Sequence, residues 1–211
     1  MLALLAATTA TAAWADQCGP VKGTPGKFDY YLLSLSWAPA YCATPSGKSN
    51  TQECGPGTNY GFVVHGLWPQ FTNGTWPQCC QAVAPVANDP VLTKLSAVMI
   101  GDSLHQHEWE KHGSCVTTVQ DDYFGKIQQA ADTFGLAPGL SPDSYSQIKV
   151  SDLKAFWPVA PTGSITTQCS GKGKTLSEVH ICLDGTLAPI PCPAAEVKAD
   201  NCAGSVVLQG R

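Results

Sequence analysis

Charged side chains are scarce in this sequence. They make up 13% of its 211 residues, whereas soluble domains usually carry about a quarter. The 12 basic and 16 acidic residues leave a net charge of −4, and neither sign gathers into a tail or block. These absences exclude a protein that binds polyanions through a broad basic surface, so any nucleic acid would have to be held by a few well-placed groups.

Long apolar runs and zinc-type cysteine pairs are also missing. After the N-terminal stretch, no run approaches the roughly 20 apolar residues that a membrane span needs, so we expect no membrane association. No C-x-x-C pair occurs, and adjacent cysteines suit zinc poorly. Ten cysteines, an even number, instead predict five disulfides in an oxidising compartment. The candidates are Cys18, Cys42, Cys54, Cys79, Cys80, Cys115, Cys169, Cys182, Cys192 and Cys202.

The N-terminus resembles a secretory signal peptide. An apolar run is followed by Ala13-Trp14-Ala15, an A-x-A cleavage pattern, although the usual basic segment before the apolar run is missing. The alternative is an ordinary N-terminal helix. We expect residues 1–15 to be a signal peptide and residues 16–211 to form one domain, because this length buries a sizeable core without a second domain. With the cysteines, this predicts a secreted or periplasmic protein.

Two apolar segments predict central strands. Residues 28–37 are apolar on both alternating faces, and residues 60–67 form a similar run that Pro69 is expected to end. The segment 38–57 between them is rich in proline, glycine and serine, which predicts a loop tied by its cysteines, without a catalytic signal.

The remaining elements are helices followed by a hairpin. Asp89-Pro90 predicts a helix start, residues 121–134 an amphipathic helix ended by a glycine, and residues 151–156 a short helix. Residues 165–169 and 176–183 predict a β-hairpin around a turn at 171–173. The sequence therefore predicts a single α+β domain with a central, mostly antiparallel sheet packed against several helices and stabilised by disulfides.

The segment QHEWEKHGSC, residues 106–115, concentrates ionisable groups. On an α-helix each residue advances by about 100°, which places Lys111, Glu108 and His112 at about 40°, 100° and 140° from His107. These four side chains would share one face. The alternative, a surface helix with ion pairs between residues four apart, explains Glu108 and Lys111 but not two histidines on that face.

A second candidate segment is His65-Gly66-Leu67-Trp68-Pro69, at the end of a predicted strand. Taken alone, either His65 or Trp68 fits a structural role. Together with the first segment they indicate phosphoryl transfer without a metal: one histidine removes a proton, the other donates one, and a lysine neutralises charge on the phosphate. RNA would supply its own nucleophile, the 2′-hydroxyl.

Zinc hydrolysis is the alternative that HEWEKH raises. In HExxH the two histidines are four residues apart and share a helix face. Here His107 and His112 are five apart, about 140° around an α-helix, and Lys111 would repel a cation. We therefore expect no metal.

The segments FVVHGLWPQ and QHEWEKHGSC resemble, in order and separation, the two active-site segments of the ribonuclease T(2) family, which are secreted, metal-independent acid ribonucleases. The resemblance extends more loosely from the strand at Phe28, through the helix at Tyr123, to the C-terminal hairpin. It implies an endoribonuclease that forms 2′,3′-cyclic phosphates and then, more slowly, 3′-phosphates.

The resemblance also implies a role for each residue. His65 matches the acid that protonates the leaving 5′-oxygen, and His112 the base that takes the 2′-hydroxyl proton. Glu108 and Lys111 match the pair that polarises the phosphate and stabilises the transition state, and His107 matches a phosphate-binding histidine.

For the base, Trp68 matches a stacking tryptophan, and Trp76 lies near the place of a second aromatic residue. Gln70 stands where some fungal members have an aspartate that contacts adenine. Its amide both donates and accepts hydrogen bonds, so purine preference is left open.

The resemblance further implies disulfides Cys42–Cys54, Cys182–Cys192 and Cys169–Cys202. Cys115 would pair with Cys79 or Cys80, and Cys18 with the other one of these two.

We therefore expect an endoribonuclease for single-stranded RNA with low base specificity that acts as a monomer and needs no cofactor. The alternatives are a catalytically silent RNA-binding or toxin-like relative and a metal-dependent phosphodiesterase.

Overall fold

One mixed sheet organises the chain in the computed structural model, which describes residue 18 and residues 22–137, 139–171 and 174–211. The predicted signal peptide and the centre of the predicted hairpin turn lie outside these residues. The strands are β1 (Tyr30–Trp37), β2 (Phe62–Gln70), β3 (Ser146–Lys149), β4 (Ile165–Ser170), β5 (Thr175–Leu183) and β6 (Ser205–Leu208). They follow the order β2-β1-β5-β6-β3, with β4 also paired to β5. Only β5 and β6 pair in parallel among the described strands, which confirms the mostly antiparallel prediction.

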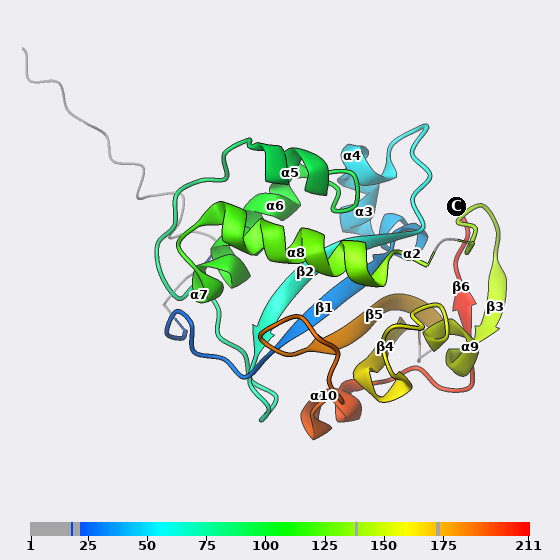
Figure 1. Cartoon of the computed structure of the whole chain (residues 1–211). Coiled ribbons are helices and arrows are strands. Elements are labelled where there is room, and N and C mark those ends of the chain that lie inside the picture. Colours follow the sequence, from blue (N-terminus) through cyan, green and yellow to red (C-terminus); the bar gives the residue numbers. More distant parts are fainter. Residues whose placement is uncertain (1–17, 19–21, 138, 172–173) are drawn as a thin grey trace, which may run out of the picture.

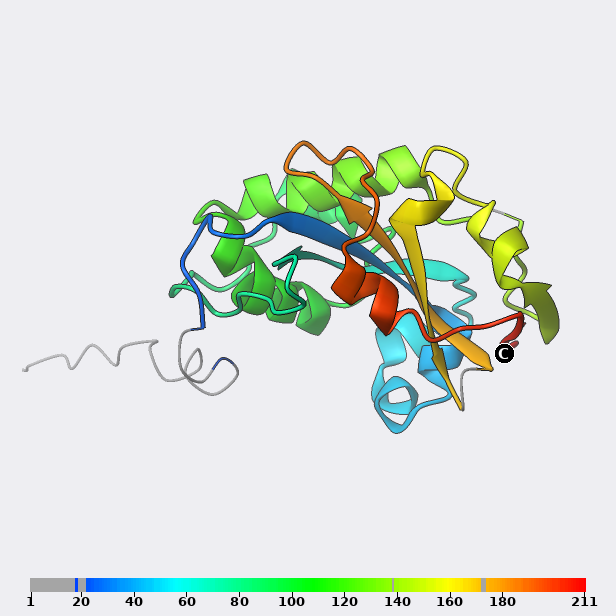
Figure 2. The same cartoon turned by 90° about the horizontal axis from the view of Figure 1, so that it is seen from below.

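Helix α8 (Gln120–Phe134) covers one face of this sheet, and α10 (Ala194–Ala199) lies on the other side (Figures 1 and 2). Leu33 and Leu35 of β1 share the main core with Phe124 and Ile127 of α8. Because side chains alternate along a strand, the neighbouring residues of β1 point to the opposite face. One face of the sheet is therefore core, and the other is free to carry a site.

Two predicted helices begin at the expected residue or within one residue of it. Helix α5 (Pro90–Leu95) begins where Asp89 accepts a hydrogen bond from the amide of Leu92, as the Asp-Pro pair predicts. Helix α9 (Val150–Lys154) ends two residues before the predicted limit. A 3-10 turn, η2 (Thr162–Ser164), precedes β4.

The prediction that residues 38–57 form a loop is wrong. This segment contains three short helices, α2 (Ala38–Cys42), α3 (Pro45–Ser49) and α4 (Thr51–Cys54). Thr44 caps α3 and Asn50 caps α4 through side-chain hydrogen bonds. Prolines near the first helical position and capping side chains start helices even in a segment rich in helix-breaking residues.

Strand β2 differs from the prediction in two ways. It lies at an edge of the sheet, not at its centre, and it continues through Pro69 to Gln70. An edge strand tolerates proline because the missing N–H is not needed for a second neighbour. The pairing with β1 also skips a residue: Gly66 lies opposite Ser34, but Val64 lies opposite Leu35. His65 is thus the extra residue of a β-bulge, a feature that redirects a side chain.

The helix that carries the second motif is not a regular α-helix. After α6 (Asp102–Glu108), the chain winds into a π-helical turn, η1 (Trp109–Gly113), and then into α7 (Ser114–Val116). The predicted angular spacing is therefore wrong beyond Glu108. A π turn bonds residues five apart, so His107 and His112 lie closer to one side than about 140° on an α-helix would allow. Gly113 is required here, since a Cβ would clash with the rings of Trp109 and Tyr123.

Five disulfides cross-link the described part of the chain. Three have the pairing that the resemblance implies outright: Cys42–Cys54, Cys169–Cys202 and Cys182–Cys192. The open choice is resolved as Cys18–Cys79 and Cys80–Cys115. A set of five disulfides fits an oxidising compartment outside the cytosol. Among the described residues, no helix combines the length and apolar character required to cross a membrane.

Candidate active site

The residues singled out in the two motifs converge on one cleft, about 440 Å³ in volume. Strand β2, the α6–η1 segment, β5 and α10 form its walls. The lining residues that the sequence predicts are His65, Trp68, Gln70, Trp76, His107, Glu108, Lys111 and His112. All eight predicted site residues therefore share one cavity, although three of them, His65 in a bulge and Lys111 and His112 in a π turn, belong to features that the sequence pattern does not reveal.

His65 is surrounded by carboxylates. Its Nδ1 lies 2.7 Å from Oε1 of Glu178, and its Nε2 lies 3.8 Å from Oε1 of Glu108. Burial acts to lower the pKa of His65, but the hydrogen bond to Glu178 and the charges of Glu108 and Glu178 outweigh it and raise the pKa above 6.5. The side chain is 34% exposed, so a bound molecule can reach it.

His112 has the opposite surroundings. It is 4% exposed, its ring stacks on Trp68 with centroids 5.5 Å apart, and its Nδ1 has no hydrogen-bond partner among the described residues. Burial, followed by the charges of Lys111, His107 and His65, holds the pKa of His112 well below 6.5. This imidazole is therefore neutral where His65 is protonated.

Glu108 lies fully buried between the two motifs. Its Oε2 accepts a hydrogen bond of 2.8 Å from Nε1 of Trp68, while its Oε1 faces His65. Burial raises the pKa of Glu108 to about 7, against the lowering effects of His65, Trp68 and Lys111. A Cβ on residue 66 would clash with the carboxylate of Glu108, so Gly66 is what allows β2 and α6 to approach this closely.

Lys111 supplies a cation to the cleft, and His107 lines the cleft as well. Lys111 lies in η1, and its backbone carbonyl accepts a hydrogen bond of 2.8 Å from the amide of Cys79. Burial, and then the charges of Lys111 and His65, lower the pKa of His107. In the described part of the chain, no three His, Cys, Asp or Glu side chains are grouped so that they could hold a metal ion.

The residues predicted to contact a base differ in accessibility. Trp68 is at the centre of the cleft, with edge-on contacts to His65 at 5.1 Å and to His180 at 5.7 Å in addition to the stack on His112. Gln70 is mostly buried, whereas Trp76 is 51% exposed. Trp68 therefore separates the three histidine rings that it contacts, in addition to offering a surface on which a base can stack.

Three further ionisable residues lie near His65 and were not predicted: His180 and Glu196 line the cleft, and Glu178 lines the adjoining cavity. His180 contacts Glu178 through Nε2 and Glu196 through Nδ1, each at 3.0 Å. The alternation of Glu178 and His180 in β5 places both on one face. This spacing could have shown that Glu178 and His180 are neighbours. It could not have shown that the pairing of β5 with β1, and of β1 with β2, brings His65 close to them.

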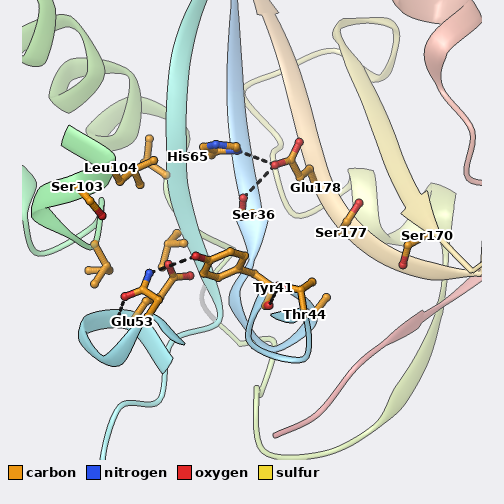
Figure 3. A pocket seen from close by; sticks show the side chains of 15 residues that line it. Ser36, Tyr41, Thr44, Glu53, His65, Ser103, Leu104, Ser170, Ser177 and Glu178 are labelled. Carbon is orange, nitrogen blue, oxygen red and sulfur yellow. Dashed lines mark hydrogen bonds and ion pairs between the residues drawn. The ribbon is translucent and has the colours of Figure 1, made fainter. Parts of the chain in front are cut away.

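A second cavity, of about 420 Å³, adjoins the cleft at His65. Figure 3 shows Glu178 and Ser36 on its sheet side, linked by a hydrogen bond, and Tyr41, Thr44 and Glu53 on the side of the short helices. The segment 38–57, to which the sequence analysis gave no catalytic signal, therefore helps to enclose a space beside His65.

Two histidines of opposite electrostatic character, with a lysine and a buried glutamate between them, are the groups of an enzyme that transfers phosphoryl groups by acid–base chemistry. The chain belongs to the Ribonuclease T2 family, whose model matches residues 28–192. It is an endoribonuclease.

Individual relatives agree. A protein named ribonuclease from Aeromonas hydrophila is 37% identical over 187 residues, which cover 82% of this chain and 80% of the relative. A probable ribonuclease from Haemophilus influenzae is 38% identical over 112 residues, 48% of this chain and 41% of that protein. Among solved structures, the RNase-related protein from Calystegia sepium superposes with a TM-score of 0.62 at 25% identity, covering 85% of this chain and 96% of its own. This last likeness concerns the fold.

Proposed function

We propose that this endoribonuclease cleaves single-stranded RNA with little base specificity, by transesterification to a 2′,3′-cyclic phosphate and slower hydrolysis to a 3′-phosphate. The observation that carries the proposal is the opposite electrostatic setting of His65 and His112 across one cleft. A reaction that needs one proton removed and another donated at the same pH requires two such groups.

In the first step, His112 accepts the proton of the 2′-hydroxyl, which then attacks the phosphorus. His65 donates its proton to the departing 5′-oxygen. The resulting protonation states suit the second step, in which His65 takes a proton from water and His112 returns one to the 2′-oxygen. The lowered pKa of His112 and the raised pKa of His65 favour these starting states.

Glu108, Lys111 and His107 act on the phosphate. Lys111 offers a cation to the oxygens on which charge grows. Glu108, whose pKa of about 7 keeps it protonated under acidic conditions, can donate a hydrogen bond to a phosphate oxygen, and His107 holds another oxygen. Fixed groups of this kind stabilise the transition state more than the ground state.

Trp68, Gln70 and Trp76 contact the base on the 2′-hydroxyl side. Stacking on aromatic rings tolerates every base, and the Gln70 amide can both donate and accept, which supports low specificity. Because His65 faces both cavities, the nucleoside on the leaving side enters the second cavity.

The proposal extends to processing and location. Residues 1–15 are removed as a signal peptide, and residues 16–211 act as a monomeric, secreted or periplasmic catalytic domain that needs no metal or cofactor. The intact mass of the exported protein tests the cleavage site, and its elution volume tests the monomer.

Digestion of a defined oligoribonucleotide in excess chelator, with products identified by mass, tests the reaction. We expect fragments ending in cyclic phosphate, then 3′-phosphate, and no cleavage at a 2′-deoxy position. Loss of activity that added zinc restores would indicate the metal-dependent phosphodiesterase. RNA binding without products would indicate the silent relative.

A further inference from the structure

An alternating series of carboxylates and imidazoles runs from His65 through Glu178 to His180 and Glu196, which line the cleft. Oε1 of Glu178 contacts Nδ1 of His65, and its Oε2 contacts Nε2 of His180 at 3.0 Å. Nδ1 of His180 in turn lies 3.0 Å from Oε1 of Glu196. The proposed phosphate site needs only the first of these four residues, so the other three have no function in that scheme.

The geometry fixes the proton positions along this series. Both ring nitrogens of His180 face carboxylate oxygens, and only a doubly protonated imidazole can donate from both. Burial opposes that charge, but the hydrogen bonds to Glu178 and Glu196 raise the pKa of His180 to about 9. His180 is therefore a cation at neutral pH.

Glu178 is consequently held as an anion. It accepts from His180, from His65 and, at 3.1 Å, from Oγ of Ser36, and Figure 3 shows the last two contacts converging on one oxygen. Burial acts to raise the pKa of Glu178, but these hydrogen bonds lower it far below 4.5. A carboxylate that cannot take a proton fixes Nδ1–H of His65 as a donor, which leaves Nε2 to carry the reactive proton.

We propose that Glu178 is a positioning residue for His65, which it orients with the Nε2 proton toward the leaving 5′-oxygen, and that His180, held between Glu178 and Glu196, keeps Glu178 ionised. This inference rests on the proposed role of His65 as general acid.

Other charged groups also face His65. Glu108 lies on α6, Glu53 on α4, and His107 and His112 on the opposite wall. Among the described residues, however, only Glu178 bonds to Nδ1, so only Glu178 can set the orientation of the ring as well as its charge.

The test compares two substrates that differ in their need for an acid. An RNA dinucleotide has an alkoxide leaving group that must be protonated, whereas a uridine 3′-(4-nitrophenyl) phosphate releases a nitrophenolate that leaves without a proton. Glu178→Gln should lower kcat/KM for the dinucleotide by about tenfold or more at pH 8, and move the alkaline limb of its pH profile down by about 1–3 units. The rate with the aryl ester should stay within about twofold of the native rate, since that substrate bypasses general-acid catalysis.

Two further variants make the result decisive. Glu178→Asp keeps the negative charge but moves it away from Nδ1 of His65. This variant is used in place of Glu178→Gln if Glu178→Gln does not fold. Asp132→Asn removes the carboxylate of an exposed ion pair with Lys94 on the far face, and should leave both rates and the pH profile unchanged.

The inference is overturned if Glu178→Gln cleaves the dinucleotide at the native rate with an unmoved alkaline limb. It is also overturned if the variant loses activity equally on both substrates, because a merely structural role would produce that result. His65→Gln separates this from failure of the proposed function. If the aryl ester does not rescue that variant, His65 is not the acid.

Discussion

His65 and His112, two of the histidines that line the cleft, have identical side chains in opposite surroundings. His65 projects from a bulge in an edge strand, partly exposed, with carboxylates on two sides. His112 lies inside a π turn, buried against an indole, and its charged neighbours are a lysine and other histidines. The first environment raises an imidazole pKa and the second lowers it.

This difference comes from the fold and not from the residue type, and it supports the proposed assignment of acid and base. The separation depends on the carboxylates beside His65, first Glu178 and then Glu108, and on the burial of His112 next to the cation of Lys111. The following experiments test this difference, in order of decreasing expected effect.

Removing either imidazole should have the largest effect. His65→Phe and His112→Phe should each lower kcat on RNA by at least about a hundredfold, the scale of general acid–base catalysis. The aryl ester distinguishes them, because it should rescue the loss of the acid but not that of the base. Native activity in either variant would show that its histidine is misassigned.

Gly66→Ala should come next, since it forces apart the strand and the helix that carry the two histidines. The new Cβ clashes with the Glu108 carboxylate and the indole of Trp68, and overpacking of this kind costs about 1–3 kcal/mol. We expect a lower midpoint in urea and at least about a tenfold loss of kcat/KM. Gly125→Ala is the matched control, because its Cβ meets open space on α8 and should slightly stabilise the protein.

The pH profile measures the contrast directly. The base must be neutral, so kcat/KM should rise through a pKa well below 6.5. The acid must be protonated, so the rate should fall through a pKa above 6.5. The result is a bell with a broad top around pH 6.5. The pKa of Glu108 is about 7, so its ionisation also affects the rate on the alkaline side of the bell. Glu108→Gln removes that effect. A narrow bell or an alkaline optimum would contradict the assignment.

Lys111→Met should have the smallest effect on the profile. Loss of the cation beside His112 should raise the pKa of that imidazole and move the acidic limb up by about one unit, with the alkaline limb nearly fixed. The plateau rate should also fall, because Lys111 is proposed to contact the phosphate. Lys94→Met, at an exposed ion pair, is the control. An unmoved acidic limb would mean that burial alone sets the pKa of His112.

Much of this arrangement could be predicted from the sequence. The apolar segment 28–37, the predicted hairpin strand 176–183, the Asp-Pro start at residue 89 and the amphipathic pattern of 121–134 all correspond to observed elements. The inventory of the cleft could be predicted as well, because the residues of each motif are close together in the chain.

What could not be predicted depends on register and winding. Nothing in FVVHGLWPQ marks His65 as the residue that the pairing skips, and an unbroken α-helical pattern hides the π turn at Trp109. Glu178 is separated from His65 by 113 positions, and only the pairing of β1 with β5, which sets Ser36 opposite Glu178, brings it near. Such long-range pairings leave no local pattern.

The Cys80–Cys115 bond has a consequence for proteolysis. Residues 81–89 between these cysteines are irregular and largely exposed, the kind of segment in which proteases nick a folded chain. After such a cut, His65 and His112 would belong to different polypeptides. Of the disulfides that the structure describes, only Cys80–Cys115 would join them. The nicked protein would be a split enzyme, whose two halves a thiol reductant could uncouple.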